Sequence, residues 1–404
     1  MKQLFNIQSD VTFYLLLGFL FLINFSIAGC YILFTVLLLQ WIGYTILNGF
    51  YIPALPRYYK FLLLYAVVTL ISSLTAVDRW VSIKDNKEAF LYLLIPLFLV
   101  IITSKKRLII SLYTVLISGV LSAAIGIVDA FRRGGVSLDF RLKGFLSHWM
   151  TFSGLLMLTF IFFFVYVFYE KRFKMRIAIS IGLILILITI YLSLTRSIWI
   201  GIAFALGTFI IYFKPKILYI AIPFIILAFI FLPPTVKNRF ISIVDINDAS
   251  NKDRIFMARM AVNIVKDYPV TGVGPNNIPM VYDRYKPPEA QQTNLHLHNN
   301  FFQVAAERGI LGLLSLLIAF VSIIINLVRK IKIMPHAEKV IPLGVLFVFI
   351  GFLVAGLFEY NYGDTEIKFL LFFFISIPFI TLKESLFEIS DNKINRVNSN
   401  GTPI

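Results

Sequence analysis

Two histidines, two residues apart, are the strongest candidates for chemistry in this sequence. His296 and His298 lie where a polar segment meets a long apolar run, and His148 opens another apolar run. Histidine gains and loses a proton near neutral pH, so it can serve as a general base. A His-x-His pair can also bind zinc, although the remaining ligands would have to be distant acidic residues or His148. A third interpretation is a histidine at the membrane interface that is hydrogen-bonded for packing.

Arginines form a second set of candidates. Arg196 separates two apolar runs, and Arg254 and Arg259 lie in the one long polar segment. A guanidinium group donates two parallel hydrogen bonds to a phosphate, so several together would suit a lipid diphosphate. Arg196 could instead extend its charged end from an apolar helix towards water.

Acidic residues complete the set. Glu359, Asp364 and Glu366 lie in one short loop, and Glu307 directly precedes Arg308. A carboxylate from the short loop could accept a hydrogen bond from a histidine and fix its orientation. The sequence does not say which carboxylate does so, and the adjacent charges of Glu307 and Arg308 are equally compatible with charge balance within a helix.

The composition indicates where these residues must work. Of the 404 residues, 59% are hydrophobic and only 14% are charged, whereas an average soluble domain has about 25% charged residues. Long apolar runs such as Ile177–Tyr191 require lipid, in which only helices and closed barrels satisfy the backbone. Alternating ten-residue segments are absent and Cys30 is the single cysteine. We therefore predict an all-α polytopic membrane protein without a disulfide framework, and a soluble enzyme is excluded.

Apolar runs of about 20 residues or slightly fewer predict membrane-spanning helices. Twelve candidates cover residues 12–27, 29–47, 60–77, 89–103, 108–130, 145–169, 177–194, 197–213, 217–233, 299–328, 340–358 and 367–382. The predicted organisation is spans one to nine within 1–233, one large loop domain with short helices over 234–297, spans ten to twelve within 298–382 and a tail over 383–404.

Basic residues in the short loops predict that both termini face the cytoplasm and that the large loop faces outward. The net charge of +16 then reflects this bias and contact with anionic membrane lipids, so it does not indicate nucleic-acid binding. Within the large loop, the pattern predicts a helix from Asp253 to Lys266, capped by Ser250 or Asn251, that lies along the membrane surface. In span ten, Gly309 and Gly312 would share a face with His298 and admit a neighbouring helix.

The motifs of residues 180–315 resemble the O-antigen ligase and polymerase superfamily. The resemblance rests on the segments Leu194–Trp199, Asp253–Arg259 and Asp267–Pro275, and on His298-Asn299 followed by Gly309-x-x-Gly312.

This resemblance implies a GT-C-like glycosyltransferase of the bacterial inner membrane that needs no metal ion and no other cofactor. Members of the ligase branch transfer O-antigen from undecaprenyl diphosphate to a sugar hydroxyl of lipid A-core in the periplasm. By motif, His298 corresponds to the essential histidine of the family, and Arg196 and Arg254 correspond to its essential arginines. We expect further substrate contacts, which are assigned to Arg259, His296, Asn299, Glu359 and Asp364.

The residue types agree with this chemistry independently of the resemblance. Arginines can stabilise the negative charge that develops on a departing diphosphate, and a histidine can accept the proton of the attacking hydroxyl. A single base without a second nucleophile predicts inversion at the anomeric carbon. The alternatives are the polymerase of the same superfamily, since Leu313 replaces the threonine frequent in ligases, a transferase acting on protein hydroxyls, and a polytopic transporter or flippase.

Overall fold

The chain folds into helices that are long and apolar enough to cross a membrane. The computed structural model describes residues 6–49, 52–137, 140–219, 223, 230, 231, 234–290, 295–335 and 338–381, and no strand occurs in these ranges. The six long apolar helices are α2 (Ile27–Asn48), α6 (Lys105–Arg132), α7 (Trp149–Val167), α8 (Phe173–Leu192), α9 (Arg196–Phe213) and α14 (Asn300–Ile333). Three shorter apolar helices are α1 (Asp10–Leu22), α3 (Tyr59–Leu74) and α15 (Val340–Ala355). The expected class, an all-α polytopic membrane protein, is confirmed.

Two of the predicted spans are each divided between a short α-helix and a 3-10 helix. Residues 89–103 fall in a 3-10 helix, η1 (Asn86–Leu93), and a short helix, α5 (Leu94–Ile101), which follow α4 (Arg79–Asp85). Residues 367–382 fall in α16 (Thr365–Ser376) and η3 (Ile377–Phe379). Proline contributes to both breaks, because Pro96 and Pro378 lack an amide hydrogen and are tolerated only in the first turn of a helix. The predicted span 217–233 lies mostly outside the described residues, which include only η2 (Pro215–Ile217) and a few positions beyond it.

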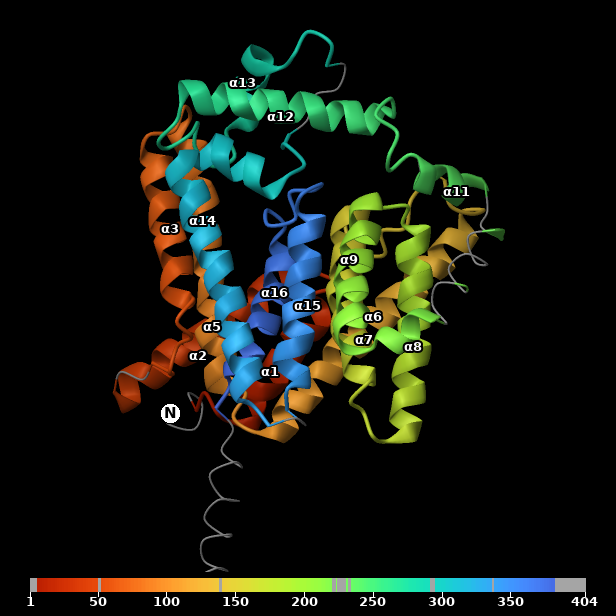
Figure 1. Ribbon diagram of the computed structural model, residues 1–404. Helices are drawn as coiled ribbons and strands as arrows, with labels where there is room; N and C mark the ends of the chain where they lie inside the picture. The colour runs from red at the N-terminus through yellow and green to blue at the C-terminus, as the bar shows by residue number, and fades with distance from the viewer. Residues whose placement is uncertain are drawn as a thin grey trace, which may run out of the picture.

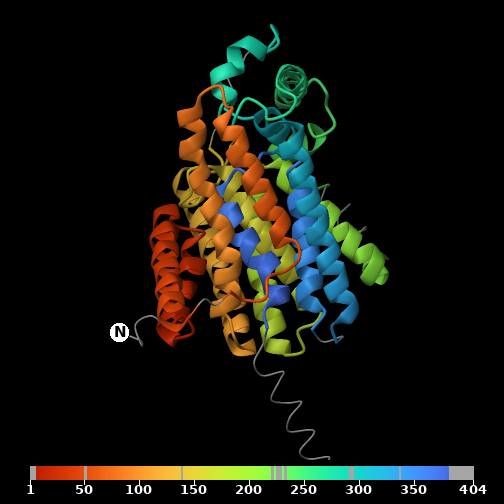
Figure 2. The ribbon, with the colours of Figure 1, turned by 90° about the vertical axis from the view of Figure 1, so that its left-hand side faces the viewer.

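The helices form a bundle in which distant parts of the chain are neighbours. On one side α3 packs against α14, and on the other α15 packs against α7 and α9 (Figure 1). The central α16 contacts α5 and α7, and α1 and α2 pair at one edge (Figure 2). Phenylalanine fills the interior, with side chains fully buried at Phe162, Phe349, Phe352, Phe369 and Phe372. Since lipid tails are as apolar as these rings, close packing rather than exclusion of water favours this association.

A layer of short helices covers one end of the bundle. It contains α11 (Pro234–Ile241), α12 (Ala249–Asp267) and α13 (Ile278–Tyr285), and α12 lies across the ends of the spanning helices (Figure 1). Apolar residues of α12 such as Met260 and Ile264 form a small separate core with α13 and with Ala306 of α14. The predicted helix 253–266 is therefore present, and part of its apolar face packs on protein.

The helix α12 begins earlier than the sequence pattern indicated. Its cap is Asp248, whose carboxylate accepts a hydrogen bond from the backbone N–H of Ser250 at 3.1 Å. Ser250 and Asn251 lie inside the helix, so the prediction that one of them caps it is wrong. Aspartate satisfies a free amide at a helix start as well as serine or asparagine does, so the helix can begin at Ala249, about one turn earlier than predicted.

A glycine-rich turn packs into a break in α14. Gly309 has φ of 63°, which interrupts the helical backbone, and an added Cβ there would lie 2.2 Å from the carbonyl oxygen of Val270. The N–H groups of Val273 and Gly274 donate to the carbonyls of Ala306 and Glu307 at 3.0 and 2.8 Å. The small residue thus admits the 269–274 turn, and the expectation of a neighbouring helix at Gly309 is wrong.

Candidate active site

His298 lies in a fixed turn just before α14. Its φ is 45°, an unusual value for a residue with a side chain. The next residue, Asn299, caps α14 by accepting hydrogen bonds from the N–H groups of Phe301 and Phe302 at 2.8 and 3.0 Å. Its amide also donates to the carbonyl of Leu357 at 2.8 Å. His298 therefore precedes the helix, and the expectation that it shares a helical face with Gly309 is wrong.

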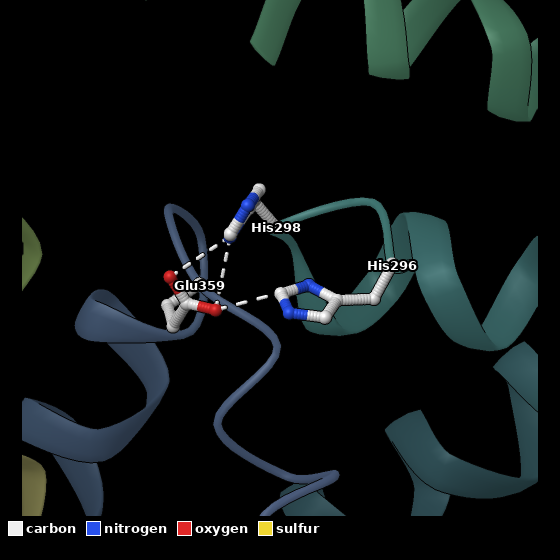
Figure 3. Close-up of side chains that lie close together, drawn as sticks. All are labelled: His296, His298 and Glu359. Atoms are coloured by element: carbon white, nitrogen blue, oxygen red, sulfur yellow. Dashed lines mark hydrogen bonds and ion pairs between the residues drawn. The ribbon is translucent and has the colours of Figure 1, made fainter. Parts of the chain in front are cut away.

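Glu359 is the carboxylate that pairs with His298. The Nδ1 atom of His298 lies 3.0 and 2.9 Å from the two carboxylate oxygens of Glu359 (Figure 3). Glu359 is buried, and it follows the end of α15. Burial raises its pKa, but the hydrogen bond from His298 and the charge of Arg254 act in the opposite direction, and the resulting pKa lies below its usual range. A carboxylate that stays ionised here favours the His298 tautomer with hydrogen on Nδ1, which leaves Nε2 to accept a proton.

His296 stands beside this pair. Its ring lies edge-on to the ring of His298, with centroids 4.3 Å apart, and its Nδ1 is 3.9 Å from Glu359 (Figure 3). Burial lowers the pKa of His296 to about 4, so this ring is neutral at neutral pH. Ligand atoms of the two histidines and Glu359 lie within 4.8 Å of one another, which is a geometry that could hold a metal ion. Glu359 would be the third ligand of such a site, but in this structure its carboxylate is hydrogen-bonded to His298.

An apolar cavity opens beside His298 and contains one arginine. Its volume is about 340 Å³, and most of its lining is apolar, including Ile255, Phe302 and Phe358. Arg254 of α12 lines the same cavity, and its Nε donates to the carbonyl of Phe358 at 3.2 Å. No hydrogen bond to a described residue uses its Nη2, so this donor remains for a ligand. The cavity combines a guanidinium group, an imidazole and an apolar wall.

Arg196 has a different environment from Arg254. It begins α9, is 5% exposed, and its Nη1 donates to the carbonyl and hydroxyl of Ser242 at 2.6 and 2.9 Å. Its Nη2 donates to Asp248 at 3.0 Å, to Asn251 at 2.9 Å and to the hydroxyl of Ser250. These bonds fasten α9 to the start of α12, the helix that carries Arg254. The alternative expectation, that Arg196 extends its charged end towards water, is therefore wrong, because its guanidinium is buried.

The remaining candidates are distributed around this centre. Asp364 accepts a hydrogen bond from Thr151 at 2.9 Å, and burial together with Glu359 raises its pKa to about 7. It lines a second cavity of about 220 Å³ that also contains His296. Arg259 is exposed on α12 and does not line the cavity of Arg254. His296, His298 and Glu359 are thus brought together, Asn299 fixes the turn, and Arg259 lies outside the group.

Two further arginines lie near the site: Arg239, which the sequence places in the same large loop as Arg254, and Arg141, which the sequence did not single out. Arg239 lies 3.9 Å from Asp248, and burial followed by the charges of Arg196 and Arg141 lowers its pKa to about 10. The guanidinium of Arg141 lies over the ring of Trp149 at 4.9 Å. The distance of Arg141 in sequence from the other arginines left no spacing pattern by which to group it with them.

Glu307 forms a buried ion pair with Arg308 and lines the second cavity together with His296 and Asp364. It accepts a hydrogen bond from Arg308 at 2.6 Å and another from Gln303 at 2.7 Å. Arg308 also approaches Asp85 at 3.9 Å. Of the two interpretations of Glu307, a site carboxylate or a partner that balances the charge of Arg308, these contacts support the second.

Residues 181–317 match the family model described as O-Antigen ligase. This segment is therefore similar to the O-antigen ligase family. The match begins within α8 and ends within α14, so it includes Arg196, the layer of short helices and His298. It confirms the resemblance to the O-antigen ligase and polymerase superfamily over about a third of the chain and assigns a glycosyltransferase-like class of enzyme. No curated protein matches the chain.

Proposed function

We propose that this protein is an O-antigen ligase that transfers a glycan from undecaprenyl diphosphate to a sugar hydroxyl of lipid A-core. The observation that carries the proposal is His298, hydrogen-bonded to Glu359, beside Arg254 at one cavity, within the part of the chain that resembles the O-antigen ligase family. An imidazole held by a carboxylate is suited to remove a proton. A guanidinium beside an apolar wall is suited to a diphosphate that carries a lipid chain.

The proposed reaction is a single displacement without a metal ion or another cofactor. The acceptor hydroxyl gives its proton to Nε2 of His298 as its oxygen bonds to the anomeric carbon of the donor. The bond from that carbon to the diphosphate oxygen breaks, and Arg254 stabilises the negative charge that remains on the diphosphate. Glu359 stabilises the imidazolium that forms. Attack opposite the leaving group inverts the anomeric configuration.

Arg196 and the neighbouring cations support this step in two ways. Arg196 holds the start of α12 through Ser242 and Asp248, so it keeps Arg254 at the cavity. Its charge, together with that of Arg239, also makes the region favourable for an anion. The electrostatic contribution falls with distance, so Arg254 is the direct contact in this proposal.

The membrane arrangement is part of the same proposal. Twelve spans would place both termini in the cytoplasm and would turn His298 and the layer of α11, α12 and α13 towards the periplasm. The lipid-linked donor and the lipid A-core acceptor would then both reach the site from the outer leaflet of the inner membrane. A GT-C-like organisation of residues 1–233, 234–297 and 298–382 follows from this arrangement.

Analysis of accumulated glycans tests the assignment and separates ligase from polymerase. A bacterial strain that lacks this protein should accumulate full-length O-antigen on undecaprenyl diphosphate, while its lipid A-core remains without O-antigen. Accumulation of single repeat units on the carrier would identify a polymerase instead. Normal O-antigen on lipopolysaccharide together with a transport defect would favour the transporter alternative.

A further inference from the structure

A basic groove lies between α3 and α14 at the end of the molecule away from His298. The groove has a volume of about 430 Å³, and Arg57, Lys60 and Arg329 lie on it. Arg57 and Lys60 are at the start of α3, whose other end bonds to the 269–274 turn through Ser72. Arg329 is 20 residues beyond Gly309, where α14 is interrupted, and this corresponds to roughly 30 Å along the second part of the helix. The groove is therefore distinct from the candidate active site.

The three basic side chains line one groove and are not paired with acidic residues among those that the structure describes. All three side chains are exposed, and none has an acidic partner within 4.0 Å in the part of the chain that the structure describes. The Nζ atom of Lys60 lies 4.9 Å from the centroid of the Phe61 ring. Like charges at one groove repel each other, and a bound anion would remove that repulsion.

An apolar strip continues from these cations along α14. Leu317, Ile318, Val321 and Ile325 line the groove and are between 36% and 53% exposed. From Leu317 to Arg329 the helix rises by roughly 18 Å. An apolar strip with cations at one end matches an amphipathic molecule that has an anionic head and a hydrocarbon chain.

We propose that this groove binds one anionic phospholipid. Its phosphodiester head contacts Arg57, Lys60 and Arg329, and one acyl chain lies along the α14 strip. A second copy of the chain is a poorer occupant, because a two-fold contact at this surface would bring the same three cations face to face. If the site proposed above faces the periplasm, the lipid comes from the cytoplasmic leaflet.

Native mass spectrometry of the purified full chain in detergent, titrated with phosphatidylglycerol, tests the proposal. Wild type should retain one phosphatidylglycerol more tightly than phosphatidylcholine. The double variant Arg57→Gln/Arg329→Gln should bind phosphatidylglycerol roughly 30-fold more weakly, which corresponds to about 1 kcal/mol for each removed cation. The control Lys105→Gln/Lys106→Gln removes the same charge from the start of α6, outside the groove, and should bind as wild type does.

Two further variants keep the test decisive. Arg57→Lys/Arg329→Lys retains the charges and should keep most of the affinity. Val321→Trp adds bulk at a side chain that is 53% exposed, so it fills the groove without disturbing the core and should weaken binding with all cations present. Unchanged phosphatidylglycerol binding by Arg57→Gln/Arg329→Gln or by Val321→Trp, equal retention of phosphatidylcholine, or a lipid-free dimer would each overturn the proposal.

Discussion

At the residue scale, the position of His298 depends on two neighbours with different functions. Asn299 caps α14 and bonds to Leu357, which fixes the turn, and Glu359 bonds to Nδ1 and fixes the ring. The sequence could identify His298 and a carboxylate in the 359–366 loop by residue type. It could not select Glu359 over Asp364, because the choice depends on how the end of α15 meets the start of α14.

Replacement of Glu359 by glutamine should reduce the transfer rate while the protein still folds. Glutamine keeps the size of the side chain, but its amide can donate to Nδ1 and stabilise the tautomer that has no free Nε2. We expect a loss of roughly 10²-fold or more in the rate constant of transfer, measured with purified enzyme and lipid-linked donor. The exposed Glu289→Gln is the matched control, and an unchanged rate for Glu359→Gln would contradict a directing role of this carboxylate.

Replacement of Arg254 by lysine should also reduce transfer, although the charge is kept. Lysine lacks the planar guanidinium that donates to the carbonyl of Phe358 and that, in the proposed mechanism, also binds the diphosphate. A decrease of roughly 10-fold to 10²-fold in kcat/KM is expected, consistent with the loss of one charged donor to a developing anion. Arg284→Lys, an exposed arginine paired with Asp267 outside the cavity, should behave as wild type. Equal activity of both variants would remove Arg254 from the proposed mechanism.

At the scale of elements, periodicity predicted most helices but not their junctions. Apolar runs located α6, α7, α8 and α9 within a few residues, because a membrane helix must be apolar over its whole length. The break at Gly309 was not predictable, since a glycine in a helical pattern is compatible with close packing as well as with positive φ. The hydrogen bonds from the 269–274 turn to the carbonyls of Ala306 and Glu307 favour the positive φ at Gly309.

Gly309→Ala should destabilise the protein. The added Cβ would lie 2.2 Å from the carbonyl oxygen of Val270, and alanine is strained at φ of 63°. We expect a loss on the order of 2 to 4 kcal/mol and a lower melting temperature in detergent. Gly207→Ala in α9 is the control, because nothing lies within 4 Å of its added Cβ, and it should be neutral or slightly stabilising. Equal melting temperatures for Gly309→Ala and Gly207→Ala would contradict the close contact between Gly309 and Val270 at the break in α14.

Asp364 links stability to pH at the start of α16. Burial first, and then Glu359, raises its pKa from 3.8 to about 7. Between these values the folded protein binds more protons at this group than the unfolded chain does, so the contribution of Asp364 to stability falls as pH rises. Asp364→Asn can still accept the hydrogen bond from Thr151 but does not titrate.

The expected result for Asp364→Asn is a smaller decrease in melting temperature between about pH 4 and pH 7 than in wild type. The effect at neutral pH should be on the order of 1 to 4 kcal/mol in favour of the variant. Thermal melts of both proteins at matched pH values measure it. Parallel melting curves across this range would mean that the carboxyl group of Asp364 titrates with an ordinary pKa.

At the scale of the whole molecule, the candidate site is assembled from four separated parts of the chain. Arg196 begins α9, Arg254 lies on α12, and His298 meets Glu359 from beyond α15. The sequence could place these residues on one side of the membrane, because each falls at the end of an apolar run or in the large loop. It could not separate the roles of the arginines, because these follow from burial: Arg196 is enclosed by α12, whereas Arg254 lines the cavity.

The sequence grouped Arg259 with Arg254 because both lie in the predicted loop helix, but the structure separates their side chains. The two lie five residues apart on one helix, so they point in different directions from its axis. Only the packing of α12 on α13 and α14 decides which of them turns towards the bundle.

The most direct test of the central claim is glycan transfer from undecaprenyl diphosphate to lipid A-core by wild type and His298→Ala, reconstituted at equal amounts in the presence of EDTA. Removal of a general base reduces a rate by roughly 10²-fold to 10⁴-fold. We predict that wild type forms product with EDTA present and that His298→Ala forms almost none. Product formation by His298→Ala at the wild-type rate, or loss of wild-type activity that zinc restores, would contradict a metal-independent mechanism with His298 as the base.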